Sequence, residues 1–339
     1  MDISGRKKTF RFASFIHHFL IKPLALLNKN PVILKTRSFH LVYFGLFSAV
    51  GFMASASVFF FYLDSRDALA GLPILPVAFF YILADMIGVK AFYYLALGKE
   101  FFKKPKYYLN ETTMYNQGGL FGILAVGITV ALIYDISLLI MFDALALSSC
   151  IGLFFGRLGC CNYGCCFGVP TQSPISITYE TPHSKILRTN PELCGVALVP
   201  TQIYTAYFDL TMFIIFTLVA NVYPADGIIT LIFIFLFNGF RIIIQKYRFT
   251  EPSDRLNFTK TAFLYLAAGL VIWSGVFAGS KATLIPRMNS ILITPVSWAQ
   301  FMATSFDVCL SVVMIGVIAF LFYGLHGRKM GTHLNLESE

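Results

Sequence analysis

Eight long apolar segments decide what this chain of 339 residues can fold into. A membrane-spanning helix needs roughly 20 apolar residues, and backbone polar groups inside a bilayer are satisfied only within helices or closed barrels. Charged residues make up 13% of the chain, against about a quarter in soluble domains. The sequence therefore predicts an all-α integral membrane protein. Its spans lie near residues 39–63, 72–98, 118–134, 137–155, 201–221, 226–245, 261–279 and 296–323.

The span count depends on the segment 118–155. This segment forms either two short helices around Asp135 or one broken helix, so we expect about seven or eight transmembrane helices and a small extramembrane cap. The chain then divides into a basic, interfacial N-terminal segment (1–38), one transmembrane domain (39–323) and a polar C-terminal tail (324–339). The cap is predicted at 157–200, where the stretch SPISITYET alternates like a strand.

The net charge of +9 is concentrated in a few segments. Basic residues gather in 1–37, in 99–106 and directly after the last span. Positively charged loops stay in the cytoplasm, so both ends of the chain and the 99–110 loop are predicted inside. Such a basic stripe marks topology or contact with anionic lipid, and the sequence contains no nucleic-acid-binding module. We therefore expect the membrane, and no nucleic acid, as a partner.

Several ionisable residues fall at membrane depth, where a charge is costly and marks a candidate functional site. The alternative is a structural ion pair between helices, for example Asp85 with Lys90. The candidates are Asp85, Lys90, Asp143, Arg157, Asp209 and Arg241.

Three arginines indicate what such a site would bind. Arg241, Gln245 and Arg248 are spaced i, i+4 and i+7, which places them on one helix face. If that face meets Arg157, three guanidinium groups converge near the membrane surface. Guanidinium groups bind phosphate oxygens two at a time, and a cluster of like charges needs an anion as its partner. The arginines therefore predict a site for an anionic phospholipid.

Two glycine-rich segments have two interpretations. Residues 117–122 read QGGLFG, and 156–168 contain four glycines. Missing side chains let a head group approach the backbone, or let two helices pack closely. The sequence leaves both open.

The segment GRLGCCNYGCCFG at 156–168 resembles the glycine–arginine signature of bacterial prolipoprotein diacylglyceryl transferases. The resemblance lies in Arg157 and in the four glycines of the segment. Other parts of the chain are similar to further family segments, in the same order and spacing. These parts are Gly88 with Lys90, Gly118 with Gly119, Asp143, the PTQIY that contains Gln202 and Tyr204, and RIIIQKYR from Arg241 to Arg248.

The resemblance implies an enzyme of the bacterial cytoplasmic (inner) membrane. The family transfers a diacylglyceryl group from phosphatidylglycerol to a lipoprotein cysteine, as part of lipoprotein biosynthesis, and no cofactor is expected. Arg157, Arg241 and Gln117 would be the catalytic residues, and the acceptor would be a protein or small-molecule nucleophile. The expected substrate-binding residues are Arg248, Gly118, Gly119, Gly168, Gln202, Tyr204, Lys90 and Gln245.

The departures from the family pattern concern proton transfer. Gln117 stands where the family has histidine and cannot accept a proton at neutral pH. Gln245 and Thr205 replace glutamates, and Val199 replaces another histidine. The resemblance thus implies a divergent paralogue that keeps the phosphate half of the site. The alternative on the same fold is a phospholipid-binding or lipid-moving protein without transferase chemistry.

The membrane topology is a further departure. Family members have seven spans with the cap outside, whereas 261–279 adds a span here and the charge pattern places the cap inside. The sequence leaves the side of the cap open.

Four of the seven cysteines lie in the signature segment, and three interpretations compete. A metal site is disfavoured because CC-x3-CC is not the usual CxxC spacing, and no metal ligand is assigned. A disulfide with Cys194 requires an external cap. The third interpretation is packing, or a reactive thiol at Cys160, Cys165 or Cys166, since a neighbouring arginine would lower a thiol pKa.

Overall fold

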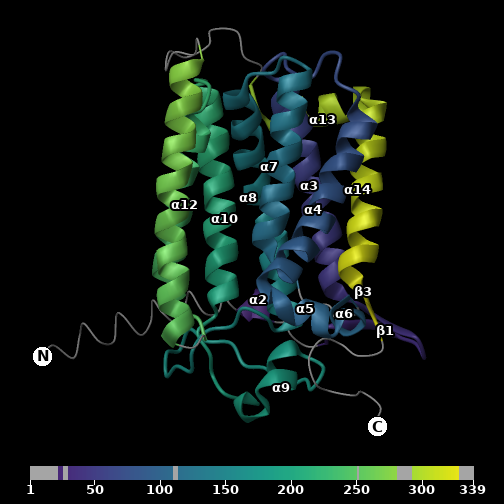
Figure 1. The fold of residues 1–339 in the computed structure, drawn as a ribbon, viewed down its shortest axis with the longest axis vertical. Helices are drawn as coiled ribbons and strands as arrows, with labels where there is room; N and C mark the ends of the chain where they lie inside the picture. The colour runs from purple at the N-terminus through teal and green to yellow at the C-terminus, as the bar shows by residue number, and fades with distance from the viewer. Residues whose placement is uncertain (1–21, 26–29, 110–113, 250–251, 281–291, 328–339) are drawn as a thin grey trace, which may run out of the picture.

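The computed structural model describes residues 22–25, 30–109, 114–249, 252–280 and 292–327 (Figure 1). In these ranges, eight helices are long and apolar enough to cross a membrane, which confirms the helical membrane fold. Most of the basic N-terminal segment and of the C-terminal tail lies outside the described residues. The eight helices are α3 (Tyr43–Asp64), α4 (Ile74–Leu97), α7 (Asn116–Ile133), α8 (Leu138–Tyr163), α10 (Thr201–Val222), α11 (Ile228–Gln245), α12 (Pro252–Gly279) and α14 (Phe306–Gly324).

The ambiguous segment 118–155 forms two helices, α7 and α8. The turn between them contains Asp135 in a left-handed conformation with φ of 53°. Helix α8 continues to Tyr163, past the predicted span end at residue 155, and stops where Gly164 adopts a left-handed conformation with φ of 76°. The hydropathy pattern could not show this end because it depends on backbone conformation. Arg157 therefore lies on the helix and not in the connection after it.

The predicted last span, 296–323, was wrong in its first part. Residues Pro295–Thr304 form a separate short helix, α13, and the membrane-length helix α14 begins only at Phe306. A reciprocal capping box between Thr294 and Ser297 starts α13, and the backbone at Ser305 is not helical. Apolar composition alone could not separate the two helices.

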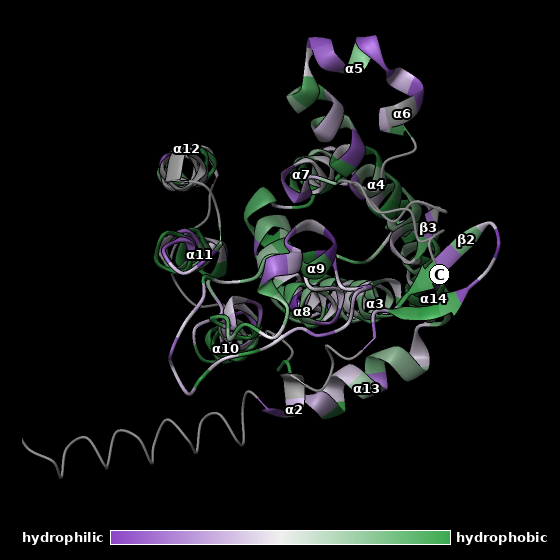
Figure 2. Ribbon diagram, turned by 90° about the horizontal axis from the view of Figure 1, so that it is seen from below, coloured by the Kyte–Doolittle hydropathy of each residue, from purple (hydrophilic) through white to green (hydrophobic). Residues whose placement is uncertain are grey.

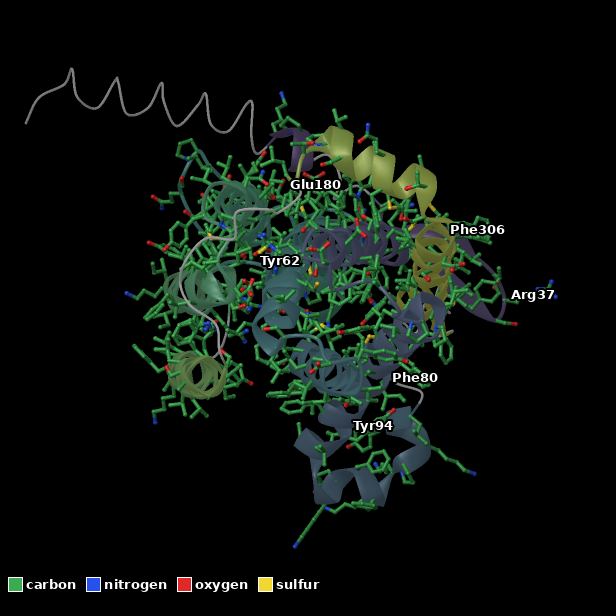
Figure 3. The ribbon with its side chains drawn as sticks, turned by 90° about the horizontal axis from the view of Figure 1, so that it is seen from above. Arg37, Tyr62, Phe80, Tyr94, Glu180 and Phe306 are labelled. Carbon is green, nitrogen blue, oxygen red and sulfur yellow. The ribbon has the colours of Figure 1, made fainter. Side chains whose placement is uncertain are left out.

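Helix α8 is the centre of the bundle, since it packs against α3, α10 and α11. Helices α4 and α7 form a close pair, and α14 packs against α3 and α4. Helix α12, the predicted additional span, lies at the edge beside α11 (Figure 2). In the view down the bundle, Tyr62 lies in the interior, whereas Phe80 and Phe306 are exposed towards the periphery (Figure 3).

One end of the bundle collects most of the extramembrane structure, and we call it the cap end (Figure 1, bottom). The cap itself is residues 164–200, with helix α9 (Lys185–Thr189) and the short helix η3 (Pro191–Leu193). The stretch SPISITYET forms no named strand within the cap, only an isolated bridge of Ile177 to Leu198. Also at this end are α2 (Lys22–Ala25), α5 (Lys99–Lys103) and α6 (Pro105–Leu109).

A small antiparallel sheet at the cap end joins the segments before the first span and after the last. Its order is β1 (Val32–Lys35), β2 (Phe39–Val42) and β3 (Leu325–Gly327). His326 in β3 is buried and meets the Tyr163 hydroxyl at 3.3 Å. Burial lowers the pKa of His326 to about 4, and the charges of Arg188, Lys185 and His40 act in the same direction, whereas a backbone hydrogen bond at Tyr323 opposes it.

The two ends of the bundle differ in charge. Among the described residues, the connections at the far end contain Asp67, Asp135 and Asp226, with Arg66 as the one basic residue. The cap end contains the basic side chains Lys22, Lys35, Arg37, Lys99, Lys103, Lys104, Lys106, Lys185, Arg188 and Lys246. With eight crossings, the first span begins and the last span ends at this same basic end.

Candidate functional site

The candidate site lies at the cap end, where the last turns of α8 approach the end of α11. Arg157 lies on α8 and Arg241 on α11. Helix α11 ends at Gln245, so Arg248 is not on the predicted shared helix face. Arg248 instead lies in an extended segment that forms an antiparallel bridge with Gly168, and this bridge brings it to the signature segment.

The three arginines share neighbours and lie within electrostatic reach of Arg241 or Cys166. Arg241 experiences the charges of both Arg157 and Arg248, and Cys166 experiences those of Arg248 and Arg157. In the part of the chain that the structure describes, neither Arg157 nor Arg241 forms an ion pair with a carboxylate. This concentration of positive charge is suited to a multiply charged anion such as a phosphate.

Asp209 is a neighbour of Arg157 that the sequence named as an ionisable residue at membrane depth but did not include in the phospholipid site. It is 2% exposed on α10, and it interacts electrostatically with Arg157 beyond ion-pair distance. Its Oδ2 atom has no hydrogen-bond partner in the described structure. The signal in the sequence was spacing, because Asp209 lies seven residues after Gln202 and therefore on the same face of one helix.

Gln202 holds the loop that follows α8. It is 1% exposed, and its Nε2 donates hydrogen bonds to the Cys165 carbonyl at 2.9 Å and to the Tyr179 hydroxyl at 3.2 Å. The neighbouring Thr201 donates a hydrogen bond from its hydroxyl to the Cys166 carbonyl at 2.8 Å. These contacts anchor the cysteine-containing loop on the first turn of α10.

Gly168 lies where three chain segments meet. A Cβ atom at this position would collide with the backbone carbonyls of Val199 and Tyr247. Val169 next to it donates to the Tyr247 carbonyl at 2.9 Å, and Val199 donates to the Val169 carbonyl at 3.0 Å. Gly168 therefore permits the close approach that brings Arg248 to the signature segment.

Gly118 and Gly119 serve helix packing, one of the two interpretations left open by the sequence. A Cβ atom on Gly118 would collide with the Gly88 carbonyl, and one on Gly119 with the Asp85 carboxylate. The two glycines thus allow α7 and α4 to touch. Asp85, suggested above as a partner of Lys90, accepts a hydrogen bond from Tyr323 at 2.6 Å.

The remaining predicted site residues are spread over four helices. Gln117 is half-buried in the first turn of α7, and no hydrogen bond joins it to the arginines within the described residues. Lys90 on α4 and Tyr204 on α10 are half-buried, while Gln245 is buried as the last residue of α11.

Asp143 has a structural function at the far end of α8. It is fully buried, and its two carboxylate oxygens accept backbone hydrogen bonds from Gly227 and Thr230, each at 2.7 Å. These N–H groups lie at the start of α11, where a negative charge also interacts favourably with the helix dipole. Asp143 therefore fixes the helix that carries Arg241.

All seven cysteines are free thiols in this structure, so no disulfide joins Cys194 to the signature segment. The sulfur atoms of Cys160, Cys165 and Cys166 lie within 4.8 Å of one another. Hydrogen bonds from the Cys160 and Cys165 thiols lower the pKa of Cys166, and the charges of Arg248 and Arg157 act in the same direction. Cys161 does not join them but is fully buried in an apolar cluster of the cap.

Comparison with known proteins gives one family and several distant relatives. The family model described as "Prolipoprotein diacylglyceryl transferase" matches residues 31–323. A phosphatidylglycerol–prolipoprotein diacylglyceryl transferase of Dehalococcoides mccartyi is 25% identical over 226 residues, which cover 66% of this chain and 84% of the relative. One from Clostridium tetani is 23% identical over 255 residues, covering 73% of this chain and 96% of the relative.

Proposed function

The chain belongs to the prolipoprotein diacylglyceryl transferase family, and we propose that it transfers a diacylglyceryl group from an anionic phospholipid to a nucleophile. Phosphatidylglycerol is the expected donor, because it appears in the names of both relatives. The eight apolar helices make it a multi-pass membrane protein, which we assign to the bacterial cytoplasmic membrane. The proposal rests on one observation, the mutual approach of Arg157, Arg241 and Arg248 at the cap end.

The arginines suit the leaving group of this reaction. As the acceptor attacks the diacylglyceryl carbon, the bond from that carbon to the phosphate oxygen breaks, and glycerol phosphate leaves with one additional negative charge. Cations held in place before the reaction stabilise such developing charge. We assign this function to Arg157 and Arg241, which have no carboxylate ion pair in the described residues, with Arg248 as their support.

The residues that would activate the acceptor are where this chain departs from its family. Gln117 cannot take a proton from an acceptor thiol, and Gln245 adds no ionisable group at the arginine helix. We therefore propose that the acceptor is a thiol, of a protein or a small molecule, that is activated by a group other than residue 117.

The test is release of glycerol phosphate from labelled phosphatidylglycerol by the purified full chain, with a cysteine-containing lipopeptide or a small thiol as acceptor. Arg157→Ala and Arg241→Ala should each lower the rate by about 100-fold or more, as expected for loss of one charge-stabilising donor. Arg37→Ala, an exposed arginine at the periphery, is the matched control and should keep full activity (Figure 3). Phosphatidylglycerol that binds and is never cleaved, with any thiol, would identify a lipid-binding protein instead.

A further inference from the structure

Three thiols from two sides of a tight turn converge beside the arginines. Cys160 lies on the last turn of α8, while Cys165 and Cys166 follow the helix end, and all three sulfur atoms lie within 4.8 Å of one another. The neighbouring Cys161 lies in the apolar cluster of the cap, and Cys194 is exposed. The four cysteines of the signature segment thus divide into three that converge and one that packs.

The backbone fixes this arrangement. Gly164 ends α8 in a left-handed conformation, and Cys166 itself has a φ of 58°, which is uncommon for a residue with a side chain. The carbonyls of Cys165 and Cys166 are held by Gln202 and Thr201. Strained residues that the surrounding structure holds in place are concentrated at functional sites, and this marks the Cys166 side chain as a candidate functional group.

The spacing and the charges fit a metal ion. Zinc–thiolate bonds of about 2.3 Å in a tetrahedral site place sulfur atoms roughly 3.8 Å apart, within the 4.8 Å limit found here. Thiolate ligands select Zn²⁺ or Cu⁺ over hard cations. Three thiolates around a divalent ion leave one net negative charge, and Arg157 and Arg248, both of which act on Cys166, are there to balance it.

We propose that Cys160, Cys165 and Cys166 bind one thiophilic cation, Zn²⁺ or Cu⁺, through their three sulfur atoms. Three protein ligands leave the fourth position of a tetrahedral ion open, as in catalytic zinc sites. The CC-x3-CC spacing hides this ligand set, because the turn at Gly164 brings Cys160 back to the pair that follows it.

The open position gives the metal a function in the proposed transfer, and this step rests on the proposed function. An acceptor thiol that binds the ion loses its proton to solvent and becomes a thiolate. Its sulfur then attacks the diacylglyceryl carbon, the new carbon–sulfur bond replaces the carbon–oxygen bond, and glycerol phosphate departs with the electron pair. The metal site would thus replace the proton acceptor that Gln117 cannot be.

The first experiment measures metal content without any assay of activity. The full chain is purified without oxygen, loaded separately with Zn²⁺ and with Cu⁺, desalted, and analysed for metal and for free thiols. We expect about one equivalent of one of the two ions per chain. The bound metal should be reduced at least tenfold in Cys165→Ser and in Cys166→Ser. Cys194→Ser and Cys161→Ala, the matched controls, should keep it. Co²⁺ should give a thiolate charge-transfer absorption band that the same two variants lose.

Two results would overturn the proposal. One is a folded protein, judged by size-exclusion chromatography, that binds neither ion or binds equally in all variants. The other is a disulfide between two of the three cysteines in the anaerobically purified chain. The activity measurement is separate: chelation should abolish release of glycerol phosphate, and Zn²⁺ or Cu⁺ should restore it. A chain that binds metal at these cysteines but cleaves no lipid refutes the transferase proposal and leaves the metal site standing.

Discussion

The replacement Asp143→Asn tests whether the buried carboxylate positions α11 or takes part in the chemistry. Asp143 accepts backbone hydrogen bonds from Gly227 and Thr230 with different oxygens, each at 2.7 Å, and is fully buried. Asparagine keeps one oxygen and turns an NH₂ group towards the other donor. The amide oxygen is best kept on Thr230, whose backbone N–H and hydroxyl both donate to one oxygen, so the Gly227 N–H loses its charge-assisted hydrogen bond and is left unsatisfied, which costs about 2–4 kcal/mol.

The assay is thermal unfolding in detergent, followed by the rate of lipid cleavage of the remaining folded protein. A loss of this size should lower Tm by roughly 5 °C or more. The matched control is Asp135→Asn at the nearby exposed turn, since asparagine tolerates the left-handed conformation found there, and its Tm should not change. An Asp143→Asn protein with an unchanged Tm would refute the positioning function, whatever its activity.

Three further outcomes are expected. The basic residues of the cap end predict that it lies in the cytoplasm. A membrane-impermeant maleimide should therefore label the exposed thiol of Cys194 in inverted vesicles and not in intact cells, with Cys194→Ser as the unlabelled control. Labelling in intact cells alone would contradict this topology. Because the pKa of buried His326 is lowered to about 4 from 6.5, the unfolded chain binds the proton first, so stability falls as the pH drops below 6.5. The free energy of unfolding should fall by about 2 kcal/mol between neutral pH and pH 5. If the Tm of His326→Gln falls over this pH range as much as the Tm of the unmodified chain, His326 is not the cause. Gly118→Val should separate α7 from α4 and lower Tm, whereas Gly156→Val, whose Cβ meets nothing within 4 Å, should not.

The sequence predicted those parts of the fold that follow from composition and period. The eight apolar segments become eight spans in the described residues. Of the ionisable residues at membrane depth, Asp85 and Asp143 have hydrogen-bond partners, whereas Oδ2 of Asp209 has none in the described structure. Helix ends were predicted less well, because the left-handed turn at Gly164 and the break at Ser305 are conformations that hydropathy does not record. The site shows the same limit: the i+7 relation of Arg241 and Arg248 was counted on one helix, although α11 stops between them.

Contacts between distant segments could not be predicted from the sequence, for a physical reason. The approach of Arg248 depends on a backbone pairing with Gly168, and the position of Cys165 depends on Gln202, 37 residues away along the chain. Such pairings are set by how helices stack, and residue spacing within one segment does not contain this information. The resemblance to a family supplied Gln202 and Gly168 as candidates, and the structure supplied what each of them contacts.

Helix α8 connects these findings, because this one helix links the two ends of the bundle. At its start, Asp143 holds the first turn of α11, and at its other end α8 presents Arg157 and Cys160. The position of Arg241 relative to Arg157 is therefore fixed by two packed helices rather than by the cap loop. In the proposed phosphate site, Arg157 and Arg241 are therefore placed by helix packing, whereas the loop with Cys165 and Cys166 is held by Thr201 and Gln202. Changes at Cys165 and Cys166 should accordingly alter the activation of the acceptor while leaving lipid binding intact, as our proposal requires.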